Sequence, residues 1–216
     1  MDTEKRIELF INDLIYRYPL LDSSRDQIKA GADLLIEAAE GGGKFLICGN
    51  GGSSADADHI VGELMKGFIH KRPLPEKQKT ALAEAGGETG KHMADLLQEA
   101  IPAVSLSSHT ALNTAFLNDV DPSLIFAQQV SGLGRHGDLL WGLSTSGNAK
   151  NVVAAAIAAK AKGLYTFAMT GEKENKLSEI CDVCIRVNGK ETYKIQELHL
   201  PVYHTLCMIL EDHLFT

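Results

Sequence analysis

The sequence has 216 residues, 44% hydrophobic and 23% charged, which suits one α/β domain with a large core. Its net charge of −7 and pI near 5.6 provide no basic excess, which argues against general nucleic-acid binding. The sequence shows neither an apolar stretch of membrane-spanning length nor a signal peptide, because the mixed-charge start Met1–Arg6 leads into no apolar segment. These features predict a cytoplasmic protein without membrane contact.

The N-terminal part predicts two helices and a strand. Apolar residues recur at helical spacing from residue 3 to Pro19, and again from a cap at Asp22 to Glu40. Three glycines end the second helix, and the apolar run 44–48 then predicts a buried strand. We expect residues 1–40 to form a helical extension that packs on the sheet or on a partner subunit.

A glycine-rich loop follows this strand and leads into a helix over 55–66. The loop reads Gly49-Asn50-Gly51-Gly52-Ser53-Ser54. Glycines let the backbone approach a ligand, and the free N–H groups at a helix start attract an anion. The loop is therefore either a phosphate-binding loop or an ordinary glycine turn with a serine cap.

His59 and Glu63 lie on the helix that follows the loop. They are four residues apart, so they share one helix face and their side chains can converge. The pair could bind a metal, transfer protons or form a plain surface contact.

The segment 70–101 differs in composition, with dense charges, prolines and glycines. Helical character at 79–85 and 91–100 predicts an inserted pair of short exposed helices with a glycine-rich joint. Its role as a lid, a subunit contact or a neutral decoration stays open.

Strands and helices alternate through the second half. The predicted strands are 103–106, 137–143, 165–169 and 183–187, and the predicted helical segments are 110–118, 124–130, 151–162, 177–180 and 194–215. Cys181 and Cys184 form a single C-x-x-C pair, which predicts reduced strand residues rather than a redox or zinc site. The alternation predicts a three-layer α/β sandwich: a mostly parallel five-stranded sheet flanked by helices, with ligands bound beyond the carboxyl ends of its strands.

A second loop, Ser144-Thr145-Ser146-Gly147-Asn148, lies between a strand and a helix. Its hydroxyl and N–H donors suit a phosphate, although a helix cap would use the same residues. Because the loop lacks the lysine of a Walker motif, it favours a sugar phosphate over a nucleoside triphosphate. In the terminal helix, Gln196 and His204 are separated by about 12 Å of rise, and Pro201 should bend or start the helix.

With these pieces in this order, the chain resembles the sugar isomerase (SIS) domain proteins, and within them the phosphoheptose isomerases. The matching pieces are Cys48–Ser53, Asp56, His59 with Glu63-Leu64, Asn118-Asp119, Ser144–Asn148 and Ile195 to His204. The resemblance spans nearly the whole chain as a single SIS domain. It implies an aldose–ketose isomerase that interconverts sedoheptulose 7-phosphate and D-glycero-D-manno-heptose 7-phosphate.

The resemblance also implies roles for individual residues. Glu63 would be the base and His204 the acid. The residues implied to contact the phosphate or the sugar are Asn50, Gly51, Gly52, Ser53, Glu63, Asn118, Asp119, Ser144, Thr145, Ser146 and Gln196. Zinc, found in some members, would be held by His59, Glu63, Gln196 and His204. The implied assembly is a homotetramer with active sites at the subunit contacts.

The sequence departs from the family at four places. Ala149 replaces a usual phosphate-contacting serine, Tyr193 replaces an acidic residue, Pro201 is unusual, and the 74–100 insertion is absent from compact members. The alternatives are a non-catalytic SIS protein that binds a replication initiator and a sensor of a sugar phosphate. Retention of the four residues His59, Glu63, Gln196 and His204 favours the enzyme.

Overall fold

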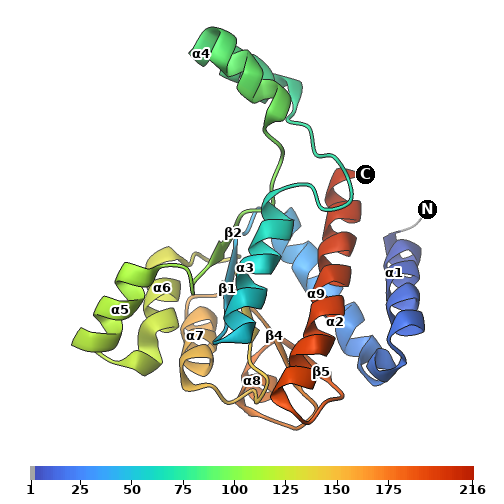
Figure 1. Cartoon of the computed structure of the whole chain (residues 1–216), viewed down its shortest axis with the longest axis vertical. Helices are drawn as coiled ribbons and strands as arrows, with labels where there is room; N and C mark the ends of the chain where they lie inside the picture. Colours follow the sequence, from blue (N-terminus) through green and yellow to red (C-terminus); the bar gives the residue numbers. More distant parts are fainter. Residues whose placement is uncertain (1–2) are drawn as a thin grey trace.

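The computed structural model describes residues 3–216, and its centre is a five-stranded sheet in the order β2-β1-β3-β4-β5 (Figure 1). The strands are β1 (Phe45–Cys48), β2 (Ala103–Ser105), β3 (Leu139–Leu143), β4 (Tyr165–Gly171) and β5 (Val183–Val187). All four neighbouring pairs are parallel. The chain leaves β1 toward β2 and returns on the other side at β3, so β1 and β3 flank the point where the strand order reverses.

Helices cover both faces of the sheet, as the sequence predicted. They are α1 (Thr3–Arg17), α2 (Arg25–Glu40), α3 (Gly52–Met65), α4 (Glu76–Leu96), α5 (Thr110–Asp119), α6 (Ile125–Leu133), α7 (Lys150–Ala161), α8 (Lys176–Ile180) and α9 (Thr192–Phe215), with short 3₁₀ turns at Pro19–Ser24 (η1) and Pro122–Leu124 (η2). α1, α2, α3 and α9 contribute to one core cluster, whereas α6, α7 and α8 contribute to the other. The predicted three-layer arrangement is confirmed.

The central strands β1 and β3 are buried on both sides, which explains why they read as continuous apolar runs, whereas the edge strand β5 is only partly buried. In β1, for example, Phe45 and Ile47 face the α2–α9 core, while Leu46 and Cys48 face the α7 core. Burial on both faces therefore fixes the register of the strand with respect to both helix layers.

α4 projects from the body as an arm (Figure 1). Its two halves meet at Gly87, which has φ 53° and ψ −127°, and fold back so that Gly90 lies against Leu82. The two chain segments that connect this arm to the body contact each other. Pro73 and Gln98 form an isolated antiparallel β-bridge, and the Glu99 N–H donates a hydrogen bond to the Arg72 carbonyl at 2.8 Å.

Two details of the helices differ from the sequence prediction. The first half of the arm begins at Glu76 rather than 79, and the second ends at Leu96 rather than 100. α9 neither starts nor breaks at Pro201 but runs from Thr192 to Phe215. Packing of α9 against α1, α2 and α3 stabilises the helix through the proline. The division into an SIS domain, a 1–40 extension and a 70–101 insertion stays a prediction.

No helix within the described residues combines the length and apolarity needed to cross a bilayer. The four cysteines are free: Cys48 and Cys207 are buried, and Cys181 and Cys184 are partly buried. Burial raises the pKa of the Cys181 thiol to about 12. A thiol that resists ionisation is a poor nucleophile, which argues against a redox role. Of the predicted strand pair, only Cys184 lies in a strand, because Cys181 stands at the end of α8.

Candidate functional site

The two predicted phosphate loops lie side by side where the strand order reverses. One follows β1 and the other follows β3, and these two strands are neighbours. The loops are joined by a reciprocal side-chain pair: Asn50 donates to Asn151 at 2.9 Å, and Asn151 donates back at 2.8 Å. Sequence reasoning singled out Asn50 but missed Asn151, because the partnership depends on the order of the strands.

Within the part of the chain that the structure describes, both loops lead into helices that start without a side-chain N-cap, although the Val152 N–H of α7 already donates to Asn151 Oδ1 at 3.0 Å. Across residues 3–216, no side chain accepts a hydrogen bond as the N-cap of α3 or α7. Gly51 stands at the N-cap of α3 with φ 57°, a conformation that favours glycine. Two uncapped helix starts at the reversal point are a favourable environment for a phosphate.

The β3–α7 loop is held in place by the start of α8. The Leu177 N–H donates to the Gly147 carbonyl at 3.1 Å, and the Lys176 N–H donates to Asn148 Oδ1 at 3.2 Å. Gly147 has a φ of 64° and packs against the buried Asn175. A Cβ atom added at residue 147 would lie 2.0 Å from the Asn175 side chain, so only glycine fits there. These contacts fix the loop shape before any ligand arrives.

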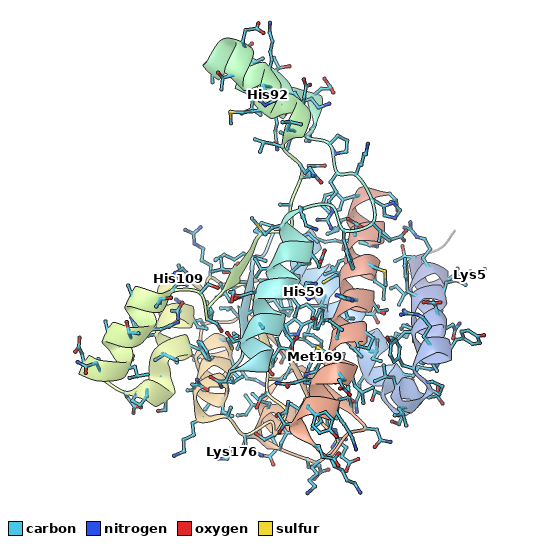
Figure 2. The ribbon with its side chains drawn as sticks, viewed as in Figure 1. Lys5, His59, His92, His109, Met169 and Lys176 are labelled. Carbon is cyan, nitrogen blue, oxygen red and sulfur yellow. The ribbon has the colours of Figure 1, made fainter. Side chains whose placement is uncertain are left out.

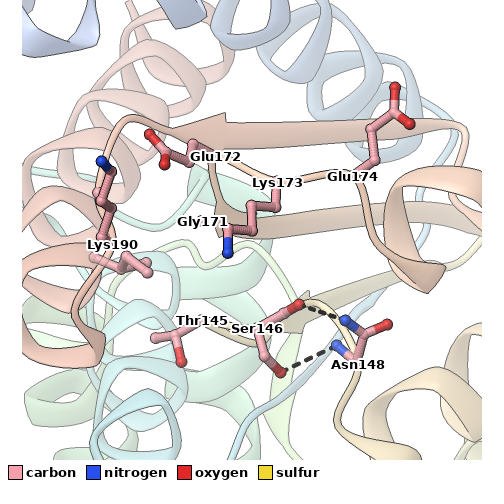
Figure 3. A pocket seen from close by; sticks show the side chains of 10 residues that line it. Thr145, Ser146, Asn148, Gly171, Glu172, Lys173, Glu174 and Lys190 are labelled. Atoms are coloured by element: carbon pink, nitrogen blue, oxygen red, sulfur yellow. Dashed lines mark hydrogen bonds between the residues drawn. The ribbon is translucent and has the colours of Figure 1, made fainter.

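A cavity of about 610 Å³ opens beside this loop (Figure 3). The lining residues are Thr145, Ser146, Asn148, Gly171, Glu172, Lys173, Glu174, Gly189, Lys190 and Ile195. Figure 3 shows Lys173 directed from the β4–α8 loop toward Thr145 and Ser146. Lys173 and Lys190 belong to no recognisable sequence motif. Only the fold brings their loops to the cavity that Thr145 and Ser146 also line.

The predicted phosphate-contacting hydroxyls differ in accessibility. Ser53 and Ser144 are only 3% and 5% exposed, whereas Thr145 is partly exposed and Ser146 is exposed. Of the four, only Thr145 and Ser146 line the cavity as the structure describes it. Ser53 and Ser144 are therefore buried within the loops and do not face the cavity in this conformation.

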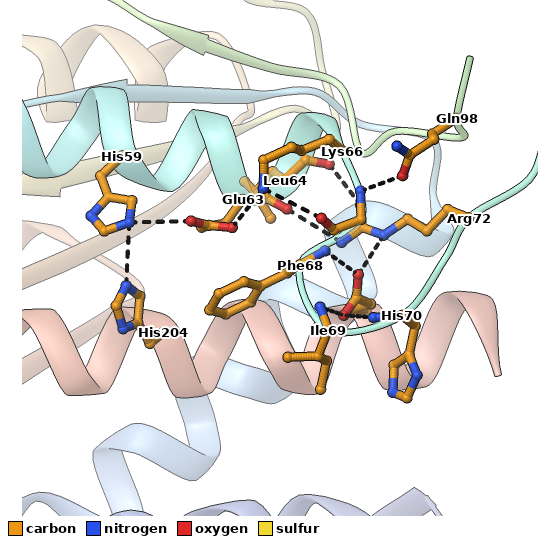
Figure 4. A network of polar contacts seen from close by, with 12 residues as sticks. His59, Glu63, Leu64, Lys66, Phe68, Ile69, His70, Arg72, Gln98 and His204 are labelled. Atoms are coloured by element: carbon orange, nitrogen blue, oxygen red, sulfur yellow. Dashed lines mark hydrogen bonds and ion pairs between the residues drawn. The ribbon is translucent and has the colours of Figure 1, made fainter. Parts of the chain in front are cut away.

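A second cluster lies farther along α3, around His59, which is labelled in Figure 2; there His59, Glu63 and His204 converge (Figure 4). His59 Nε2 is 3.2 Å from Glu63 Oε1 and 3.4 Å from His204 Nε2. Lys66, which the sequence analysis did not single out, lies 3.2 Å from the other Glu63 oxygen. Burial and then the neighbouring His59 lower the pKa of His204. His204 is therefore neutral near pH 7, the form that can both accept and donate a proton.

Gln196 does not join this cluster. The Gln196 side-chain amide packs against Gly52. A Cβ atom added at residue 52 would lie 2.6 Å from Gln196 Nε2. α3 and α9 thus run in the same direction, with Gln196 beside the start of α3 and His204 beside His59. Gln196 instead lies on α9 beside the first glycine-rich loop.

The four predicted zinc ligands fit the metal only in part. Ligand atoms of a tetrahedral zinc site are about 3.3 Å apart, which the distances from His59 Nε2 to Glu63 and His204 match. However, nowhere in residues 3–216 do three His, Cys, Asp or Glu side chains gather as a metal-binding group. The donor types and two spacings suit zinc, but the set is incomplete as arranged.

Asn118 and Asp119 lie apart from both parts of the site. They end α5, are exposed, and bond to each other through Asn118 Nδ2 and Asp119 Oδ1 at 2.8 Å. α5 packs against η2 and α6, on the far side of α7 from α9 in Figure 1. One chain alone does not bring these two residues to the predicted sugar site.

A buried ion pair holds the end of α3 that carries Glu63 (Figure 4). Arg72 Nε donates to Glu211 at 2.8 Å, and both side chains are fully buried. Arg72 also donates to the carbonyls of Leu64 at 2.8 Å and Glu63 at 3.3 Å. Glu211 accepts the backbone N–H groups of residues 68–70. The network fixes the turn after α3 against α9.

The buried His199 makes a testable contribution to stability. Burial lowers its pKa to about 4, and its Nε2 contacts the Thr170 carbonyl at 3.3 Å. Between pH 6.5 and 4 the unfolded imidazole binds a proton that the folded one does not, so stability falls as pH falls. As the pH falls from 7 to 4, the free energy of unfolding should decrease by about 3 kcal/mol less in His199→Gln than in the unaltered protein. Urea unfolding at a series of pH values from 7 to 4 measures this difference. The same pH dependence of the free energy of unfolding in both proteins would contradict the expectation.

Comparison with known proteins agrees with this geometry. The sequence profile described as "SIS domain" matches residues 19–98 and 96–171. The phosphoheptose isomerase of Synechocystis is 37% identical over 188 residues, covering 87% of this chain and 84% of that protein. That of Rhodospirillum rubrum is 38% identical, covering 87% and 86%.

Solved structures give the same result. The phosphoheptose isomerase of Neisseria gonorrhoeae superposes with a TM-score of 0.73 at 28% identity, covering 98% of this chain and all of that one. The enzyme of Francisella tularensis gives 0.74 at 27% identity, with the same coverage. Sequence, fold and site loops agree, and the chain belongs to the SIS domain family, in the group of the phosphoheptose isomerases.

Proposed function

We propose that this protein is an aldose–ketose isomerase that converts sedoheptulose 7-phosphate to D-glycero-D-manno-heptose 7-phosphate. The observation that carries the proposal is the approach of His204, on α9, to His59 and Glu63 on α3, the helix that begins at the first glycine-rich loop. The names of its relatives point to the same reaction class.

In the reaction that we propose, Glu63 removes a proton from C1 of the ketose and returns it to C2. The O–H proton moves from O1 to O2, and the neutral imidazole of His204 carries it. The electron pair released at C1 forms the enediolate and later the C2–H bond, so no oxidant or reductant is needed. Glu63 has only 12% of its side chain exposed, which limits exchange of its proton with water.

The phosphate end uses donors that differ from the family pattern. Ala149 offers no hydroxyl and does not line the cavity, whereas Lys173 supplies a cation there. We expect Lys173→Gln to raise KM about fivefold with kcat unchanged, the effect of losing roughly 1 kcal/mol of ground-state binding. Steady-state kinetics measures this, with the exposed Lys176→Gln as the matched control. A loss confined to kcat would contradict the role.

We also propose that one zinc ion binds at His59, Glu63 and His204, with Gln196 as a fourth ligand after a change of its side chain. Bound zinc would stabilise negative charge on the enediolate. The support is the donor set and the two spacings around His59 Nε2. Metal analysis of the purified protein, with and without a chelator, tests this proposal.

The assembly that we propose is a cytoplasmic homotetramer with active sites at the subunit contacts. Support for shared sites comes from Asn118 and Asp119, which lie away from the loops of their own chain and are free to complete a partner's site. The four free cysteines suit a reducing compartment. Light scattering on the purified protein would measure the number of subunits.

The function is tested by incubating the protein with a panel of ketose phosphates and detecting the aldose product. We expect turnover with sedoheptulose 7-phosphate and much less with pentulose and hexulose phosphates. A protein that binds a sugar phosphate without turning any over would be a sensor, and a protein that binds none would fit the partner-binding alternative.

A further inference from the structure

Tyr203 links two residues of α3 from its position on α9. Its side chain is fully buried, and its hydroxyl lies 3.0 Å from His59 Nδ1 and 3.3 Å from Asp56 Oδ1. Its ring also meets the His59 and His204 rings edge-on, with centroids 5.5 and 4.9 Å away. Neither Asp56 nor Tyr203 has a role in the chemistry described above.

The hydrogen-bond partners decide where the protons lie. A carboxylate only accepts, so the single hydroxyl proton of Tyr203 must point to Asp56 for that contact to be attractive. The Tyr203 oxygen then accepts from His59, whose proton is on Nδ1. The opposite assignment would leave Asp56 without a partner, because its other oxygen, Oδ2, is buried and bonded to nothing in the described chain.

With its proton on Nδ1, His59 presents a lone pair at Nε2. That atom faces Glu63 Oε1 and His204 Nε2. Glu63 retains Lys66 as a partner, so it does not depend on a proton from His59. Nε2 is thereby the open position of the cluster, ready to receive a proton or a metal ion.

We propose that Tyr203 is a positioning residue that, together with Asp56, holds His59 as its Nδ1–H tautomer and turns Nε2 toward Glu63 and His204. The assignment rests on the need of the buried Asp56 for a donor, which outweighs the bond to Glu63 that the Nε2–H form would make. The effect of the tautomer on turnover rests on the proposed isomerase function.

The tautomer can be read directly from the ¹⁵N chemical shifts of the His59 ring at constant pH, assigned with His59→Gln. We expect the Nδ1–H form in the unaltered protein. In Tyr203→Phe we expect a change to the Nε2–H form, which donates to Glu63 instead. Tyr165→Phe, which removes a hydroxyl bonded to Glu37 at 2.8 Å, is the matched control and should leave His59 unchanged.

An Nε2–H form in the unaltered protein would overturn the proposal, and this measurement needs no variant to fold. Identical ring shifts in a folded Tyr203→Phe protein would also overturn it. Asp56→Asn retains a side-chain oxygen acceptor and should retain the Nδ1–H form, whereas Asp56→Ala should lose it.

Kinetics separate this inference from the proposed function. For Tyr203→Phe we expect kcat to fall tenfold to a hundredfold, the usual cost of losing a hydrogen bond that orients a histidine ligand, with KM little changed. A tautomer change in a protein that turns over no sugar phosphate would support the inference and refute the function. An active enzyme whose kcat is unaffected by a confirmed tautomer change would refute the positioning role.

Discussion

Glu63→Gln is expected to lower kcat by about a thousandfold, within the range that a general base contributes. Glutamine has the same size but cannot accept a proton from carbon, so the chemical step loses its base. The contacts to His59 at 3.2 Å and Lys66 at 3.2 Å are short-range and local, so the fold and KM should change little. Steady-state kinetics and circular dichroism together measure both halves of this expectation.

The matched control is Glu84→Gln, an exposed glutamate on the α4 arm, which should leave kcat unchanged. Glu63→Asp keeps the carboxylate but withdraws it by one methylene, so we expect an intermediate rate. Turnover near the unaltered level in purified Glu63→Gln would remove Glu63 from the role of base.

Arg72→Met should lower the free energy of unfolding by about 3–5 kcal/mol, because it leaves Glu211 as a buried charge without its cation. Burial acts to raise the pKa of Glu211, but the N–H donors of residues 68–70 and Arg72 outweigh it, and the net pKa is lowered. The variant also removes the donors to the last carbonyls of α3. We expect a melting temperature lower by roughly 10 °C.

Lys71→Met removes a charge from the neighbouring exposed position and should cost almost nothing, which makes it the control for the change in net charge. Chemical denaturation of both variants at pH 7 measures the difference. Equal stability of the two would mean that the buried pair contributes no more than an exposed lysine.

The sheet was predictable from the sequence because its strands are short apolar runs between glycine-containing loops, such as Phe45–Cys48. The positions of the two glycine-containing loops were predictable for the same reason, since each follows such a run, while their binding of phosphate stays a prediction. The prediction that the helix starts or is interrupted at Pro201 was wrong, because it considered only the lost N–H of the proline; a bend there stays a prediction. Contacts of α9 with three other helices outweigh that local loss.

The convergence of His59 with His204 could be predicted only from the family resemblance. Periodicity places His59 beside Glu63 on one helix, but it contains no information on which helix packs alongside. Lys173, Asn151 and Tyr203 could not be predicted at all. Each acts across a contact between distant segments, and lysine, asparagine and tyrosine are too common on surfaces for composition to single them out.

Helix α3 fixes the separation between the two ends of the proposed site. Gly52 begins the helix beside Gln196, and Glu63 is eleven residues later, an axial distance of about 16 Å. A hydrogen-bonded helix does not stretch, and this distance exceeds the length of an extended seven-carbon sugar phosphate, so the Glu63 side chain, which leans toward the start of the helix, has to cover part of it. Discrimination among sugars of five, six and seven carbons would then depend on the residue count of one helix, and adding a turn to it should favour longer substrates.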